Sequence, residues 1–299
     1  MQPEVAMKTE TYEVQIGKLL EQLTLEEKIG MIHGAGLFRT EGVERLSIPP
    51  LFFSDGPMGV RAEFADNEWR NTGTTDDFVS YLPCNSAVAS TWNRELAGEE
   101  GRVLGEEARG RGKDMILAPG INIKRSPFCG RNFEYYSEDP LLAGKMGAAM
   151  VRGIQSQHIA AAVKHFACNN KETNRKHSDS RVSERALREI YLKAFEIIVK
   201  EADPWVIMSA YNMINGHRAS ENHDLLEGIL RDEWHFHGMV TSDWWTRGEH
   251  YKEIKAGNDV KMACGFPERV KKAMELGALD RSDLERCAKR VLDLILKID

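Results

Sequence analysis

The sequence predicts an α/β fold, a TIM-type (β/α)8-like barrel, with room for an irregular or missing first strand. Three observations predict it. Short, almost continuously apolar runs alternate about seven times with amphipathic stretches, which is typical of parallel strands covered on both faces. The length of 299 residues suits one such barrel. An open doubly wound sheet is the alternative, but no glycine-rich nucleotide fingerprint follows the first run.

Seven apolar runs are the predicted strands. Each is short, is bounded by polar or turn-forming residues, and lacks the alternation of a strand with one wet face. They are residues 51–53, 87–89, 115–118, 160–163, 205–208, 239–241 and 259–262.

Helical patterns lie around and between these runs. Thr24 and Glu27 form the sequence signature of a capping box, which opens a first helix that breaks at the glycines around 30–36. No linker and no internal repeat interrupts the chain, so residues 1–299 are expected to form a single domain. The other predicted helices are 94–111, 140–155, 183–201, 223–234 and 281–298.

Composition excludes several classes of function. A net charge of −6 leaves no basic footprint for a nucleic acid. No apolar run approaches the length of a membrane helix, and the first residues contain no apolar signal segment, so we expect a cytoplasmic protein. Secretion with a removed signal stays open. Five widely spaced cysteines without a CxxC pair predict mostly free thiols and no zinc site.

Polar side chains follow the ends of several predicted strands. In a parallel barrel these ends meet at one face, where active sites form. Taken singly, each such residue is more often part of a turn, a cap or a structural ion pair. Their coincidence at one face predicts a pocket. Its predicted members are Asp55, Arg61, Arg131, Lys164, His165, Tyr211, Asp243 and Trp244.

This mixture of groups suits a sugar. Asp55, Lys164 and His165 offer acceptors and donors to adjacent hydroxyl groups. Trp244 is predicted to offer a ring face to sugar C–H groups. Asp243 is the predicted nucleophile toward an anomeric carbon, and nearby cations are expected to hold its pKa down. A phosphate pocket would want more donors and fewer acids, and a Schiff base on Lys164, as in a barrel aldolase, is a weaker alternative.

Six motifs carry a resemblance to a known family. With them the sequence resembles the N-terminal barrel domain of glycoside hydrolase family 3, the β-glucosidase group, over nearly the whole chain. The motifs are specific in combination. They are SDGPMGVR (54–61), GRNFEYYSEDP (130–140), KHFACNNKETNR (164–175), VSERALREIYLKAFE (182–196), MSAYNMINGHRASEN (208–222) and SDWW (242–245).

The resemblance implies a retaining exo-β-glycosidase, β-glucosidase-like, that removes terminal non-reducing β-D-glucosyl residues from small oligosaccharides or aryl and alkyl β-glycosides. It implies Asp243 as the nucleophile and no metal or organic cofactor. A β-xylosidase, an N-acetylglucosaminidase and a non-catalytic carbohydrate-binding or assembly subunit are the alternatives. The implied substrate-binding residues are Asp55, Arg61, Arg131, Lys164, His165, Met208, Tyr211 and Trp244.

The general acid/base is not identified by the resemblance. In this family it is usually a glutamate of a second α/β sandwich domain, which is expected to be absent from this chain, so a missing domain or a partner chain would supply it. Another branch uses a His–Asp pair within KHFPGHG, but this chain reads KHFACNN. Weaker candidates within the chain are Glu134, Glu172, His177 and Asp179. Trp245 adds bulk that is expected to narrow or line the entrance.

Overall fold

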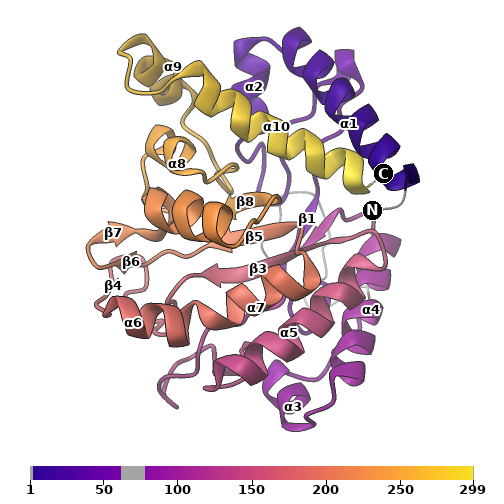
Figure 1. Ribbon diagram of the computed structural model, residues 1–299, viewed down its shortest axis with the longest axis vertical. Helices are drawn as coiled ribbons and strands as arrows, with labels where there is room; N and C mark the ends of the chain where they lie inside the picture. The colour runs from indigo at the N-terminus through magenta and orange to yellow at the C-terminus, as the bar shows by residue number, and fades with distance from the viewer. Residues whose placement is uncertain (1–2, 62–77, 299) are drawn as a thin grey trace.

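Five parallel strands form the main sheet of the computed structural model, which describes residues 3–61 and 78–298 (Figure 1). The strands are hydrogen-bonded to one another in the order β1-β2-β3-β5-β8, and each neighbouring pair is parallel. The strands are β1 (Phe53–Ser54), β2 (Met115–Ile116), β3 (Ala160–Phe166), β5 (Val206–Ser209) and β8 (Met239–Ser242).

Single backbone bridges continue the wall from β8 back to β1. The predicted run 259–262 pairs on one side with β8 and on the other with the segment around His33, and two antiparallel bridges then lead to the residue before β1. The barrel is therefore irregular at the place where an irregular first strand was expected. The bridges are Thr241–Val260, His33–Lys261, Gly34–Thr40 and Arg39–Phe52.

Side chains alternate between the inside and the outside of this wall. Ala160 and Ala162 of β3 belong to the inner apolar cluster, whereas Ala161 and Val163 belong to the cluster under the outer helices. The inside is thus a packed core rather than a pore, as in other barrels of this kind. Its strand residues are Phe53, Met115, Ala160, Ala162, Val206, Met208, Met239 and Val260.

Helices cover the outside of the sheet. Figure 1 shows α4, α5 and α7 along one side of the sheet, and α1 packed against α10 on the other. Helices α4 and α5 approach closely because Gly101 and Gly153 have no side chain at their contact. The α-helices are α1 (Pro3–Gln22), α2 (Leu25–Met31), α3 (Asn85–Ser90), α4 (Arg94–Gly110), α5 (Pro140–Gln155), α6 (Glu184–Ala186), α7 (Lys193–Ala202), α8 (His250–Ala256), α9 (Pro267–Glu275) and α10 (Arg281–Ile298).

Short elements complete the chain. A small second sheet pairs β4 with β6 in parallel and β6 with β7 in an antiparallel way. Two segments form π-helix, one between α6 and α7 and one before β8. These elements are β4 (Asp179–Ser180), β6 (Met213–Ile214), β7 (His217–Arg218), η1 (Glu44–Leu46), η2 (Asn132–Glu134), η3 (Leu187–Tyr191), η4 (Ala219–Glu221) and η5 (Asp224–Glu233).

Most predicted elements are confirmed, and one strand is wrong. The predicted helix 140–155 coincides with α5, and the capping box at Thr24 is formed in both directions. Residues 87–89, predicted as a strand, lie in α3. A three-residue apolar run cannot distinguish a strand from a buried helical turn, and two of its residues are alanine, the best helix former. Helix α1 was not predicted.

Two further expectations concern membranes and cysteines. Among the described helices, none is both long and apolar enough to cross a membrane. All five cysteines lie in the described part of the chain and are free thiols, with Cys168 and Cys287 buried. The expectation of free thiols is therefore confirmed.

A fully buried ion pair ties the end of the wall to the loop after β8. Lys261 Nζ lies 2.7 Å from Glu253 Oε2 and also donates to Thr246 Oγ1 at 2.8 Å and to the Gly248 carbonyl oxygen at 3.0 Å. The other Glu253 oxygen accepts from Ser220 and Thr246. Both charged side chains are wholly buried, so each needs the other to offset its lost hydration.

Replacing Lys261 with methionine should lower the free energy of unfolding by about 3–5 kcal/mol, because Glu253 would be left charged and unpaired in the interior. Chemical denaturation measures this. The double replacement Lys261→Met, Glu253→Met should recover part of the loss, whereas Lys272→Met, at an exposed pair with Glu275, should change stability by less than about 1 kcal/mol. A loss of similar size at both sites would contradict the assignment.

A second buried carboxyl lies on α4 without a partner. Glu100 is 8% exposed, and within the described residues neither of its oxygens has a hydrogen-bond partner. Burial raises the pKa of Glu100 to about 7. The folded state therefore binds this proton more tightly than the unfolded state. The stability that this adds is fully present below the ordinary value of 4.5 and is lost as the pH rises through about 7.

The variant Glu100→Gln keeps the shape of the protonated carboxyl and cannot ionise. We expect its free energy of unfolding to match the wild type near pH 4 and to exceed it by about 1–3 kcal/mol near pH 9. Denaturant titrations across this range measure the difference, with the exposed Glu21→Gln as the control. A constant difference at every pH would show that ionisation of Glu100 does not carry the effect.

Candidate active site

The residues predicted for the pocket gather at the carboxyl ends of the strands. Asp55 directly follows β1, and Asp243 directly follows β8. Lys164 Nζ lies 3.2 Å from Asp55 Oδ1, and His165 Nε2 lies 3.8 Å from Asp243 Oδ2. Met208 is buried inside β5. Residues separated by more than a hundred positions in sequence therefore share one site.

A register shift lets two consecutive residues of β3 face this site. The pairing of β3 with β5 is irregular between Val163 and Phe166. In a regular strand Lys164 and His165 would point to opposite faces. A bulge re-aims side chains, and here both are buried, with Lys164 against Asp55 and His165 beside Asp243.

The surroundings of Asp243 differ from the expectation in one respect. Its Oδ1 accepts the backbone N–H of Trp244 at 2.8 Å, and within the described residues no donor hydrogen-bonds its buried Oδ2. Burial raises the pKa of Asp243, and the cations of Arg131, Arg175 and Lys164 only partly oppose this. The expectation that cations hold this pKa down is wrong because desolvation outweighs them.

Asp55 has the opposite balance. Burial opposes its ionisation, but the Lys164 ammonium, the Gly56 N–H and the more distant Arg131 together hold the pKa of Asp55 below its usual value. Asp55 is thus an ionised acceptor at the edge of the site. The surroundings thus lower the pKa of Asp55 and raise that of Asp243, a difference that is common where two carboxyl groups have different roles.

His165 is held as a neutral ring. Its backbone N–H donates to Asn122 Oδ1 at 2.8 Å, and its Nδ1 lies 3.1 Å from the Tyr135 hydroxyl. Burial, together with the charges of Arg131, Lys164 and Arg175, lowers the pKa of His165 well below its usual value. A neutral imidazole beside Asp243 provides a hydrogen-bonding group without a competing ion pair.

The two arginines occupy different places. Arg131 forms an ion pair with Glu134 and contributes to the charge felt by Asp243 and Asp55. The guanidinium of Arg61 lies 4.7 Å from the centre of the Phe38 ring, and its backbone N–H donates to the Asp55 carbonyl oxygen at 2.9 Å. Arg131 therefore acts on both carboxyl groups through its charge, whereas Arg61 is tied to Asp55 through the backbone.

Trp244 does not present the open ring face that was predicted. It is 4% exposed, packs against Phe38 and Phe53, and donates its indole N–H to the Leu37 carbonyl oxygen at 2.6 Å. Little of its surface remains for a ligand, because these contacts inside the protein cover its ring. The Tyr211 hydroxyl donates to the Trp244 carbonyl oxygen at 2.6 Å, which fixes the backbone next to the carboxylate.

Sequence reasoning missed three residues that act on the site. The Tyr135 hydroxyl lies 3.1 Å from His165 Nδ1. The guanidinium of Arg175 lies 4.7 Å from the centre of the Tyr211 ring, and its charge partly opposes the rise in the pKa of Asp243 that burial causes. Asn169 donates to the Tyr135 hydroxyl at 3.2 Å. All three lie inside the motifs at 130–140 and 164–175, and their place in these motifs is the sequence signal that could have identified them.

The four weaker acid/base candidates all have other surroundings. Glu134 pairs with Arg131, and Glu172 accepts from Arg175 at 2.9 Å. Asp179 pairs with Arg181 at 2.7 Å and accepts the Gly216 N–H, while His177 is exposed. The structure does not bring His177 and Asp179 together as a hydrogen-bonded pair.

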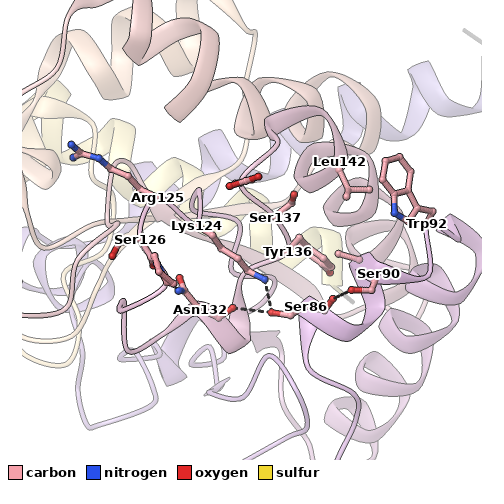
Figure 2. A pocket seen from close by; sticks show the side chains of 13 residues that line it. Ser86, Ser90, Trp92, Lys124, Arg125, Ser126, Asn132, Tyr136, Ser137 and Leu142 are labelled. Atoms are coloured by element: carbon pink, nitrogen blue, oxygen red, sulfur yellow. Dashed lines mark hydrogen bonds between the residues drawn. The ribbon is translucent and has the colours of Figure 1, made fainter.

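The structure also bears on metal binding and contains a cavity separate from this site. Within the described residues, no group of three or more histidine, cysteine, aspartate or glutamate side chains is placed to hold a metal ion. A cavity of about 680 Å³ contains none of the predicted site residues (Figure 2). In it Lys124 donates to Ser86 at 2.5 Å, and Trp92 and Arg125 lie at the two ends of the group of side chains.

Replacing Lys164 with methionine should raise the pKa of Asp55, because the ammonium that favours the ionised carboxylate is lost. A pH titration of side-chain carboxyl carbons by NMR measures this, with Asp55→Asn used to assign the signal. Lys124→Met removes a lysine of the separate cavity and should leave the titration unchanged. An unaltered Asp55 pKa in Lys164→Met would contradict the geometry.

Comparisons with known proteins agree with the fold and the motifs. Residues 54–294 match the Glycosyl hydrolase family 3 N terminal domain. A beta-glucosidase A of Butyrivibrio fibrisolvens is 52% identical over 91% of this chain and 32% of its own length. An exo-alpha-(1->6)-L-arabinopyranosidase of Bifidobacterium longum is 42% identical over 93% of this chain and 37% of its own length.

A solved structure matches the whole barrel. Beta-glucosidase 3B of Thermotoga neapolitana, in complex with alpha-D-glucose, superposes with a TM-score of 0.89 at 41% identity, covering 95% of this chain and 42% of that one. The chain spans about a third of the length of the curated relatives it matches. With a family match over most of its residues and this structural likeness, the chain belongs to glycosyl hydrolase family 3 and contains its N-terminal barrel domain.

Proposed function

We propose that this chain carries the nucleophile and the sugar pocket of a retaining exo-β-glycosidase, β-glucosidase-like, that acts on terminal non-reducing β-D-glucosyl residues. The single observation that carries the proposal is the surroundings of Asp243. It is a buried carboxylate with one oxygen held by the Trp244 N–H and the other left, within the described residues, without a donor beside His165. Beta-glucosidases among its relatives support the choice of sugar.

The proposed roles of the sugar ligands follow from their charge. Asp55 is ionised and offers acceptors, whereas Lys164 and Arg131 offer donors. Neutral His165 adds a ring nitrogen between them and Asp243. Adjacent hydroxyl groups of one glucosyl unit would thus meet acceptors and donors side by side. Met208 forms part of the apolar floor.

In the proposed reaction Asp243 Oδ2 attacks the anomeric carbon. A bond from this oxygen to the carbon forms while the bond to the leaving oxygen breaks, and the leaving oxygen takes a proton from an acid. Water then attacks the anomeric carbon and gives a proton to the same acid/base, now acting as base, while the bond from the carbon to Asp243 breaks and the sugar leaves. Arg131 and Arg175 stabilise the ionised nucleophile that burial alone would disfavour.

We further propose that the acid/base lies outside this chain, on a second domain or a partner chain. The support is that three of the acidic candidates within the chain are already paired with arginines. These are Glu134, Glu172 and Asp179. The relatives are about three times longer than the matched region, which leaves room for such a contribution. Without it, general acid catalysis worth about 10²–10⁴ in rate is lost.

One relative supports a second candidate substrate. The Bifidobacterium longum protein is named an exo-alpha-(1->6)-L-arabinopyranosidase, so a pentopyranoside is the alternative to a glucoside within the same mechanism. A non-catalytic carbohydrate-binding or assembly subunit, with Asp243 as a ligand only, is the alternative outside it. The cytoplasmic location stays a prediction of the sequence.

The chain should cleave 2,4-dinitrophenyl β-glucoside much faster than cellobiose, because the activated leaving group needs little help from an acid. Asp243→Asn should lower the rate by about 10³-fold or more, whereas Asp232→Asn, which removes an exposed aspartate, should not. Release of dinitrophenol measures the first and release of glucose the second. Equal, rapid cleavage of both substrates would place the acid within this chain.

Covalent labelling separates the enzyme from the binding subunit. A 2-deoxy-2-fluoro β-glucoside with a good leaving group should leave one fluoroglucosyl adduct on the peptide that contains Asp243, seen by mass spectrometry. A binding subunit would retain the sugar reversibly and give no adduct. Absence of an adduct together with tight glucose binding would refute the enzymatic proposal.

A further inference from the structure

Lys176 lies over two aromatic rings at the mouth of the barrel. Its Nζ is 4.9 Å from the centre of the Tyr211 ring and 5.9 Å from that of Trp245. Ammonium groups at such distances are attracted to the ring faces. The side chain is partly buried, so the two rings hold a cation in a defined place rather than leaving it in solvent.

The charge of Lys176 is not neutralised by a neighbour in the described part of the chain. Arg175 also lies over Tyr211, but its guanidinium is paired with Glu172 at 2.9 Å. Among the described residues no carboxylate forms an ion pair with Lys176. Burial, Arg175 and the exposed Arg247 lower the pKa of Lys176, while Asp243 raises it. Lys176 therefore lies within a surplus of positive charge, beside Arg175 over the same Tyr211 ring.

Trp245 lies beside this cation with part of its ring exposed to solvent. Its backbone N–H donates to the Met262 carbonyl oxygen at 2.7 Å, and its φ of 55° turns the chain sharply away from the buried Trp244. The Trp245 side chain is 42% exposed. It thus offers aromatic surface two residues beyond Asp243, on the solvent side of the proposed sugar pocket.

We infer that Lys176 and Trp245 form a subsite for the leaving group and favour one in which an aromatic ring carries a carboxylate. The indole would pack against the ring, and the ammonium would pair with the carboxylate. The inference rests on the proposed function, since it assigns the neighbour of the sugar pocket. It goes beyond that function by naming the chemistry of the group that leaves.

Binding of two thioglucosides tests the inference independently of catalysis. Phenyl 1-thio-β-D-glucoside and its 4-carboxyphenyl counterpart share the sugar and resist hydrolysis, so calorimetric titration of the full chain compares their dissociation constants. We expect the carboxylate to bind about three- to fivefold tighter, the range of a partly exposed ion pair. This preference should shrink at about 0.5 M salt, because screening weakens the pair.

Three variants identify the charge that is responsible. In Lys176→Gln the ratio of the two dissociation constants should fall to about one, and in Lys176→Arg it should stay above one, since the charge is kept. Lys171→Gln removes an exposed lysine of the same loop and should keep the wild-type ratio. Trp245→Ala should weaken both aryl ligands, because both use the ring face.

Each outcome decides between the two proposals. Equal binding of both thioglucosides by the wild type, or an unchanged preference in Lys176→Gln, would overturn the subsite while leaving the sugar pocket in place. Failure of the wild type to bind either ligand would remove the sugar pocket, and the proposed function and the subsite would both fall. A salt-sensitive preference that is lost only in Lys176→Gln supports the subsite.

Discussion

The buried pair of Lys261 and Glu253 is the constraint on which the site depends. Lys261 belongs to the segment that closes the barrel wall, through its bridge to His33, and Glu253 belongs to α8. Both hold Thr246, which comes three residues after Asp243. A charge in the interior tolerates no other arrangement, because any loss of a partner leaves an unpaired ion. Barrel closure and the position of the loop that follows Asp243 are thereby fixed by the same contacts.

Opposite electrostatic surroundings then divide the work between two aspartates. Asp55 lies against a lysine that lowers its pKa, whereas Asp243 is enclosed by protein and has a raised pKa. The distinction arises from depth and from nearby charge rather than from the type of side chain.

The sequence predicts well the elements that have a long hydrophobic period and the site residues that follow a strand. Long amphipathic helices such as α5 and α10, and polar residues after strands, could be predicted because each rests on a local pattern. The strand predicted at 87–89 could not be distinguished from a helix, since three apolar residues carry no period. The closing bridges are single contacts between distant segments, which leave no local signal.

Side-chain surroundings were less predictable than membership of the site. The raised pKa of Asp243 depends on how much protein covers it, and the buried face of Trp244 depends on packing against Phe38 and Phe53. Both are tertiary properties. The roles of Tyr135 and Arg175 likewise appear only when the loops are placed, although both residues lie inside motifs that the sequence displays.

The inner wall also has a consequence for how the sequence of the core can change. Large and small side chains face each other across neighbouring strands, with Met115 beside Ala160 and Met239 beside Val206. Because the interior is close-packed, a larger residue on β3 is tolerated only if a methionine opposite becomes smaller. Substitutions at this level of the interior should therefore covary in pairs of conserved total volume, so stable variants would be found more readily by changing these positions together than one at a time.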